Sequence, residues 1–182
     1  MLELWAGSVS CDLRMARPSA ATGLVVVTET PETRIGMSTE VISLPTEDEC
    51  EALGAFLAER IYEFNTLATG YFDGRLLAGC VKNVTGEVIA GYNGYTWGGC
   101  CELAHVWVHE AHRGRGLGAM LLRSAEADAR ARGCVQIVLA THDFQAPGFY
   151  ERMGYDRKYA IEGRPSGHVD IIYVKALGTE SS

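Results

Sequence analysis

The chain has 182 residues, of which 47% are hydrophobic and 21% charged, and its net charge of -7 corresponds to a pI near 5.2. This composition is that of one soluble globular domain. The acidic balance argues against a nucleic-acid-binding protein, which needs a surface rich in lysine and arginine. No apolar run approaches the roughly 18 residues of a membrane span, and no continuous apolar segment of a secretory signal is present near the start. We therefore expect a cytoplasmic protein with neither nucleic acid nor a membrane as a partner.

The cysteine and histidine spacings predict no metal site. Six cysteines occur without a C-x-x-C motif, which favours free thiols packed as small apolar side chains. His105, His109 and His112 are close in sequence, but the first two lie in a predicted strand and its exit. That spacing does not bring imidazoles together around an ion.

The sequence predicts an N-terminal boundary of the folded domain near Met37. Residues 1–36 show little periodicity and form a predicted N-terminal extension without an assigned role, residues 37–178 form the folded domain, and residues 179–182 form a tail. Met37 is a candidate alternative start.

A predicted strand and a predicted helix open the folded domain. Val41 to Leu44 is a short apolar run, and Thr46 with Glu49 has the pattern of a capping box, in which each side chain satisfies a free backbone N–H at a helix start. Apolar residues then recur at the helical period and predict one buried helix face. These residues are Leu53, Phe56, Leu57, Ile61 and Phe64.

The rest of the chain alternates strands and helices. The expected elements are strands 75–82 and 87–96, joined by a turn at 83–86, strand 101–108, helix 116–132, strand 134–140, helix 147–153, and strands 155–161 and 168–174. Strand 134–140 is apolar at nearly every position, which is typical of a strand covered on both faces. The order predicts an α/β fold with a single mixed, largely antiparallel β-sheet flanked by helices, and with a parallel strand–helix–strand unit over residues 101–140.

A glycine-rich turn at Arg113 to Gly118 joins the predicted strand to the helix of that unit. Its glycines let backbone N–H groups approach a ligand closely, and a helix N-terminus favours an anion, so the turn can hold a phosphate group. The turn has neither the Lys-Ser/Thr pair of a P-loop nor the first glycine of the dinucleotide fingerprint. From the residues alone, two possibilities remain open: the turn binds a phosphate-containing ligand of another kind, or it is a solvated turn without a ligand.

Three linked segments resemble the GNAT superfamily of N-acetyltransferases. The acetyl-coenzyme A motif of that family is matched by Arg113, Gly116 and Gly118, the preceding family strand by Leu103 to Val108, and the end of a family helix by Phe149 to Tyr155. The resemblance implies a GNAT fold and an acetyltransferase that uses acetyl-coenzyme A as its acyl donor and needs no metal.

The resemblance, which extends over residues 41–177, also implies which residues hold the donor. The backbone of residues 106–108 would pair with the pantetheine arm, an N–H near Val106 would polarise the thioester carbonyl, and the N–H groups of residues 114–119 would surround the pyrophosphate. The donor-binding residues implied are Val106, Trp107, Val108, Arg113, Gly114, Arg115, Gly116, Leu117, Gly118 and Ala119.

Two residues are candidates for catalysis. Tyr150 matches the family tyrosine that often donates a proton to the departing thiolate, whereas an aromatic residue at such a position also often packs in the core. Because an amine acceptor is mostly protonated at neutral pH, a general base is useful, and Glu102 at the start of strand 101–108 is the first candidate. Strict alternation would place Glu102 on the face of Ala104, Val106 and Val108, with His105 on the opposite face. Glu110, His109 and His105 are lesser candidates.

The charge distribution favours a cationic acceptor. Residues 37–112 contain 3 Lys and Arg against 11 Asp and Glu, a net charge of -8, and residues 113–182 contain 10 against 8, a net charge of +2. In the family the first half largely forms the acceptor side, where Tyr92, Tyr95 and Trp97 are candidate lining residues and the loop at 163–168 a candidate cover. We expect acetyl transfer to a primary amine of a small cationic molecule. Acetylation of a protein lysine or N-terminus, and a non-catalytic acyl-coenzyme A sensor, are the alternatives, and the sequence leaves open whether the chain forms a homodimer.

Overall fold

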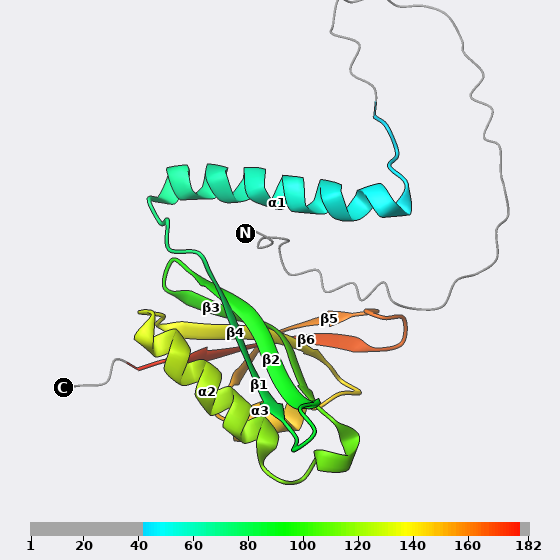
Figure 1. Cartoon of the computed structure of the whole chain (residues 1–182), viewed down its shortest axis with the longest axis vertical. Coiled ribbons are helices and arrows are strands. Elements are labelled where there is room, and N and C mark those ends of the chain that lie inside the picture. Colours follow the sequence, from blue (N-terminus) through cyan, green and yellow to red (C-terminus); the bar gives the residue numbers. More distant parts are fainter. Residues whose placement is uncertain (1–41, 179–182) are drawn as a thin grey trace, which may run out of the picture.

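The structure, a computed structural model, describes residues 42–178. The elements in chain order are α1 (Glu47–Thr69), β1 (Arg75–Lys82), β2 (Val88–Trp97), β3 (Cys100–Val108), the short 3-10 helix η1 (Glu110–His112), α2 (Leu117–Ala131), β4 (Gln136–His142), α3 (Pro147–Arg152), β5 (Asp156–Glu162) and β6 (Val169–Ala176). The strands form one sheet in the order β1-β2-β3-β4-β6-β5 (Figure 1). β3 and β4 are parallel, and all other neighbours are antiparallel. The mixed, largely antiparallel sheet flanked by helices is confirmed.

The ends of the elements follow local hydrogen bonds. The capping box is present at the start of α1, where the Thr46 N–H donates to Glu49 Oε2 at 2.8 Å. β4 begins two residues later than expected, because the Cys134 N–H donates to the carbonyl of Ala129 and still belongs to the end of α2. The expected first strand is wrong in its described part, since Ile42 and Leu44 are exposed and lie outside any strand. Val41, residues 1–36 with the candidate start at Met37, and residues 179–182 lie outside the described residues.

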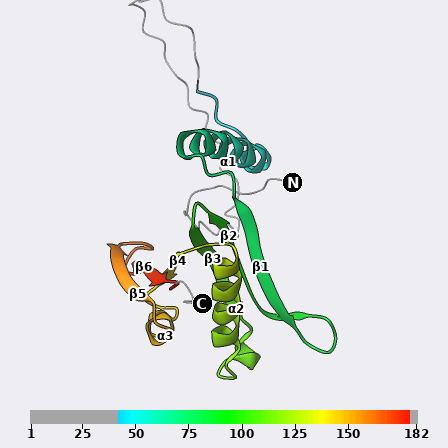
Figure 2. The ribbon, with the colours of Figure 1, turned by 90° about the vertical axis from the view of Figure 1, so that its left-hand side faces the viewer.

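The core lies between the helices α2 and α3 and one face of the sheet. α2 packs against β1, β2 and β3, and α3 lies beside β5 (Figure 2). Since burial of a Leu or Ile side chain contributes about 1.5–3 kcal/mol, this layer supplies much of the stability. The largest fully buried side chains are Tyr173, Leu77, Leu122, Ile137 and Cys101.

The apolar face of α1 is exposed, and the prediction that it is buried is wrong in this structure. Phe56 is 56% and Phe64 69% exposed, and Leu53, Leu57 and Ile61 are also exposed. Figure 1 shows the helix apart from the sheet, and its contacts with the strands are too few to cover this face. Near its C-terminal end the Tyr62 hydroxyl accepts a hydrogen bond from the Gly74 N–H. A helical period indicates that a face is apolar but does not identify what covers it.

The sheet face opposite α2, called here the open face, is only partly covered. In β4, Ile137, Leu139 and Thr141 are buried on the α2 side, whereas Val138 is half-buried and Ala140 is exposed on the open face. The expectation that this strand is covered on both faces is therefore wrong. The strand is parallel to its neighbour β3, and only one of its faces packs in the core.

Candidate active site

The parallel strands β3 and β4 separate in the middle of the sheet. Their pairing runs from Cys100↔Gln136 to Leu103↔Leu139 and then stops. Beyond that point β3 continues to Val108 in pairing with β2, and β4 continues to His142 in pairing with β6. Past this point, the facing edges of β3 and β4 form no backbone pairs with each other. Unpaired backbone N–H and C=O groups need a partner, so this gap suits an extended ligand with amide groups of its own.

A β-bulge in β3 begins where the strands separate. Asn93 pairs with His105 and the next residue of β2, Gly94, pairs with Leu103, so Ala104 is the extra residue. The bulge reverses the alternation, and Glu102 and His105 therefore lie on the same face, the open one. The prediction that Glu102 shares a face with Val106 and Val108, opposite His105, is wrong for this reason.

The glycine-rich turn enters α2 in a conformation that suits glycine. Gly114 has φ +74° and Gly116, the N-cap residue of α2, has φ +81°. Both values lie in the left-handed region, which costs other residues about 1–2 kcal/mol. A Cβ at either position would meet nothing within 4 Å, and no side chain caps the helix start. The first N–H groups of α2 therefore have no side-chain cap and are available to an anion.

The two arginines of the turn differ in their contacts. The Arg113 Nε donates to the carbonyl of Val108 at 3.1 Å, so this side chain ties the turn to the end of β3. Arg115 is exposed. The residues implied in donor binding thus form one continuous path from the unpaired edge of β3 through the turn to α2. Pantetheine and pyrophosphate are linked in that order in coenzyme A, and this path therefore fits the donor.

Tyr150 lies where α3 meets the start of α2. A Cβ added at Gly118 would come within 3.1 Å of the Phe149 ring, which places the first turn of α3 directly against the first turn of α2. Tyr150 follows Phe149, is 8% exposed, and packs its ring beside Tyr155 and Tyr173. Burial raises the pKa of the Tyr150 hydroxyl. The phenol therefore keeps its proton over the physiological range, as a general acid must.

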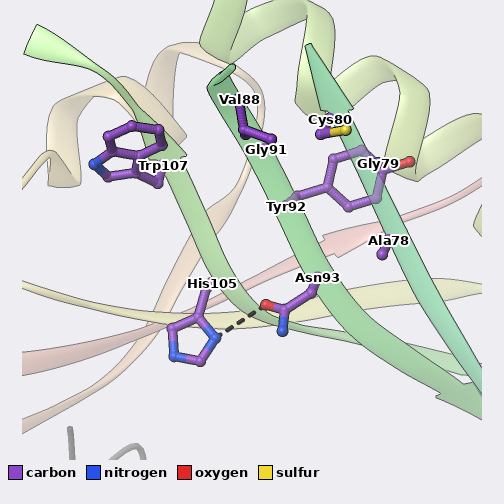
Figure 3. Close-up of a pocket in the computed structure, with 9 residues that line it drawn as sticks. All are labelled: Ala78, Gly79, Cys80, Val88, Gly91, Tyr92, Asn93, His105 and Trp107. Atoms are coloured by element: carbon purple, nitrogen blue, oxygen red, sulfur yellow. Dashed lines mark hydrogen bonds between the residues drawn. The ribbon is translucent and has the colours of Figure 1, made fainter. Parts of the chain in front are cut away.

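The open face holds two polar pairs and a depression. The Tyr95 hydroxyl donates to Glu102 Oε2 at 2.5 Å, and burial together with this carboxylate raises the pKa of Tyr95. Nδ1 of His105 lies 2.9 Å from Oδ1 of Asn93. Beside that second pair, residues of β1, β2 and β3 line an open depression of about 400 Å³ that includes Trp107 (Figure 3). A small organic cation would meet the aromatic surface of Trp107 here, and the carboxylate of Glu102 lies on the same face of the sheet.

The other residues proposed for the acceptor side are dispersed. The Tyr92 ring lies over Gly79 on the α2 side of the sheet, and its hydroxyl is 3.3 Å from Ser124 Oγ. The Trp97 Nε1 donates to the carbonyl of Tyr71 at 3.1 Å, next to the segment that links α1 to β1. Of the three aromatic candidates, Tyr95 thus comes nearest to a charged group of the open face.

Sequence reasoning missed a polar cluster at the end of β4. His142 pairs in register with Asp170 of β6, and Arg164 reaches Asp170 from the loop between β5 and β6. Asp143, which follows β4, contacts His168 at 3.2 Å, and Ala146 is the N-cap residue of α3. The sequence contains no short motif for this cluster, because its members come from two strands and a loop. Strand pairing alone brings them together.

Three wider features of the described residues bear on function. Within residues 42–178 no group of three His, Cys, Asp or Glu side chains is arranged to hold a metal ion. None of the described helices has the length and hydropathy of a membrane-spanning segment. The described cysteines are free thiols, and burial raises the pKa of Cys101 to about 12, which makes that thiol unreactive at neutral pH.

Comparison with known proteins gives consistent matches. Residues 43–155 match the model of the Acetyltransferase (GNAT) family. A blasticidin-S acetyltransferase of Streptomyces morookaense is 40% identical over 93 residues, which make up 50% of this chain and 68% of the relative. A crystal structure of an acetyltransferase from Bacillus cereus has a TM-score of 0.65 at 28% identity, covering 76% of this chain and 98% of that one. An aminoglycoside 6'-N-acetyltransferase solved with coenzyme A shares the fold, with a TM-score of 0.53 at 17% identity over 69% of this chain and 82% of that one.

Proposed function

Because the chain belongs to the GNAT acetyltransferase family, we propose that it moves the acetyl group of acetyl-coenzyme A to a primary amine of a small cationic molecule. Membership of the family makes it an acyltransferase. The observation that carries the proposal is the separation of β3 and β4 directly before the uncapped glycine turn of α2. An unpaired strand edge that leads to an anion site fits a ligand with an amide chain at one end and a pyrophosphate at the other.

The donor would be held mainly by backbone groups. The edge of residues 106–108 would pair with the amides of pantetheine, and the N–H groups of residues 114–119 would bind the pyrophosphate, with the guanidinium of Arg115 nearby. An N–H near Val106 would stabilise the negative charge that develops on the thioester oxygen as the amine attacks. Binding both substrates at once supplies much of the rate acceleration, so no covalent enzyme intermediate is needed.

Tyr150 and Glu102 are the side chains proposed to act on protons. Tyr150 is protonated at neutral pH, since burial raises its pKa, and would give its proton to the departing thiolate. Glu102 lies on the open face, where its carboxylate either takes a proton from the acceptor ammonium or pairs with that cation. These two roles differ in the kinetic constants, since loss of a base lowers kcat, whereas loss of an ion pair with the acceptor mainly raises KM.

Two observations support a small cationic acceptor. The open face holds a carboxylate, Glu102, and a separate open depression that is large enough for a small molecule. The relative that is 40% identical acts on blasticidin S, and a fold neighbour acts on aminoglycosides. Blasticidin S is therefore the first acceptor to test, followed by aminoglycosides, polyamines and amino acids.

The test combines donor binding with thiol release. Calorimetric titration of acetyl-coenzyme A should show binding to the native protein, and a panel of amines should then release free coenzyme A. Tight binding with no thiol release from any small amine, but with acetylated proteins in a treated cell extract, would favour a protein acetyltransferase. Binding with no transfer to either class would favour a sensor, and no binding by the folded protein would refute the proposal.

A further inference from the structure

A histidine and an aspartate at the ends of two neighbouring strands form an incomplete pair. Nδ1 of His142 and Oδ1 of Asp170 are buried, lie 3.5 Å apart, and have no hydrogen-bonding partner within the described residues. A buried carboxylate oxygen and a buried ring nitrogen are costly to leave unpaired. A shift of a few tenths of an ångström would join them through an N–H on Nδ1. That bond leaves Nε2 of His142 as the free lone pair of the neutral ring.

His142 lies on the open face, beside the gap between β3 and β4. His142 is the last residue of β4 and lies three residues past Leu139, where pairing with β3 ends. Alternation along β4 places His142 on the face of Val138, and Val138 pairs with Glu102, so His142 is on the open face. The side chain of His142 is 29% exposed although Nδ1 is buried, so the exposed part is the edge away from Asp170.

Neighbouring side chains fix the ring. The Phe144 ring lies 5.0 Å from that of His142, and Oε1 of Gln145 accepts the backbone N–H of His142 at 2.9 Å. Asp170 is itself held, since Nη1 of Arg164 lies 3.5 Å from its Oδ2 and compensates its charge. The remaining charged groups nearby are Asp143 and His168, which contact each other on the far side of Phe144.

We propose that His142, oriented by Asp170, is the base that accepts a proton from the ammonium group of the acceptor. This inference rests on the proposed acetyl transfer. Nε2 takes one proton from the ammonium, and the free amine attacks the thioester carbon. The new C–N bond forms as the C–S bond breaks, the thiolate leaves with the proton of Tyr150, and the second proton lost by nitrogen restores Tyr150. His142 finally releases its proton to water.

Two contrasts favour His142 over Glu102 as this base. An imidazole is a stronger base in water than a carboxylate, by about two pKa units, and is therefore better matched to an ammonium ion. Oε2 of Glu102 already accepts the hydroxyl of Tyr95. Asp170 touches no reacting atom in this scheme and is a positioning residue that fixes the tautomer of the ring. Glu102 then pairs with the cationic acceptor.

The test is the pH dependence of kcat/KM for His142→Gln and Asp170→Asn. With an amine of pKa about 10.4, an enzyme without a base uses only the neutral amine, roughly one molecule in 2,500 at pH 7 and one in nine at pH 9.5. His142→Gln should lose about 10²–10⁴-fold at pH 7, and this deficit should shrink at least about tenfold at pH 9.5. Asp170→Asn should show a smaller deficit with the same trend. Asp156→Asn, which removes an exposed carboxylate 3.5 Å from Lys158, is the matched control and should behave as native enzyme.

Binding of acetyl-coenzyme A separates this inference from the proposed function. Both variants should bind the donor as the native protein does, because neither residue belongs to the glycine turn. Equal deficits at both pH values would indicate a structural role and overturn the inference while the acetyltransferase stands. A deficit that shrinks at high pH in Glu102→Gln but not in His142→Gln would also overturn it. No donor binding by the native protein would refute the proposed function itself.

Discussion

Replacing Gly116 tests whether the left-handed start of α2 is needed for donor binding. The residue has φ +81°, and a Cβ there would meet nothing within 4 Å, so the only cost of Gly116→Ala is backbone strain. That strain amounts to about 1–2 kcal/mol. If the turn keeps its shape, the strain lowers the free energy of unfolding. If the turn relaxes in the free protein, acetyl-coenzyme A must restore it, and the dissociation constant rises by about 5–30-fold.

The two losses should therefore add to about 1–2 kcal/mol, as measured by urea unfolding and by calorimetric titration of acetyl-coenzyme A. Gly116→Asn is the matched control, because asparagine adopts the left-handed region more readily, and its total loss should be smaller. A combined loss near zero for Gly116→Ala would refute the view that this conformation matters. Equal losses for the two variants would show that something other than backbone strain is responsible.

Three further variants test the chemistry and the core. Tyr150→Phe should lower kcat by about 10²–10⁴-fold with the acetyl-coenzyme A affinity unchanged, as steady-state kinetics and calorimetry would show. Because burial raises the pKa of Tyr150, deprotonation of this residue should not lower the native activity below about pH 10. Leu122→Ala should lower the free energy of unfolding by about 2–5 kcal/mol, since the side chain is fully buried, and a loss below about 1 kcal/mol would contradict that burial. Lys175→Ala should cost about 1.5–3 kcal/mol in urea unfolding, because it removes the ammonium group 2.8 Å from the buried Glu126, which keeps Arg130 at 3.6 Å and the Tyr155 hydroxyl at 3.3 Å. Adding Glu126→Gln should recover part of the loss, and no recovery would rule out the charge of Glu126 as the cause.

The sequence predicted best what depends on local pattern. The capping box at Thr46, the glycine turn at Arg113 to Gly118 and the parallel unit around α2 are all determined by residues close in the chain. Prediction from the sequence failed where a surface depends on what packs against it. The face of α1 that contains Phe56 is apolar at the right period, and nothing in that period identifies which surface, if any, lies against it. The pairing of His142 with Asp170 also escaped prediction, since it depends on the register of β4 with β6.

The single extra residue at Ala104 accounts for several features of the site together. A bulge increases the local twist of a strand, and this one begins beside the last residue of β3 that pairs with β4. The added twist separates the two strands and so leaves the edge of residues 106–108 unpaired. The same reversal of alternation brings His105 and Trp107 to the open face with Glu102, while Val106 and Val108 pack toward α2. A strand without the bulge would have kept its partner, and the sheet would have had neither the gap that we propose for the donor nor this set of side chains on the face that we propose for the acceptor.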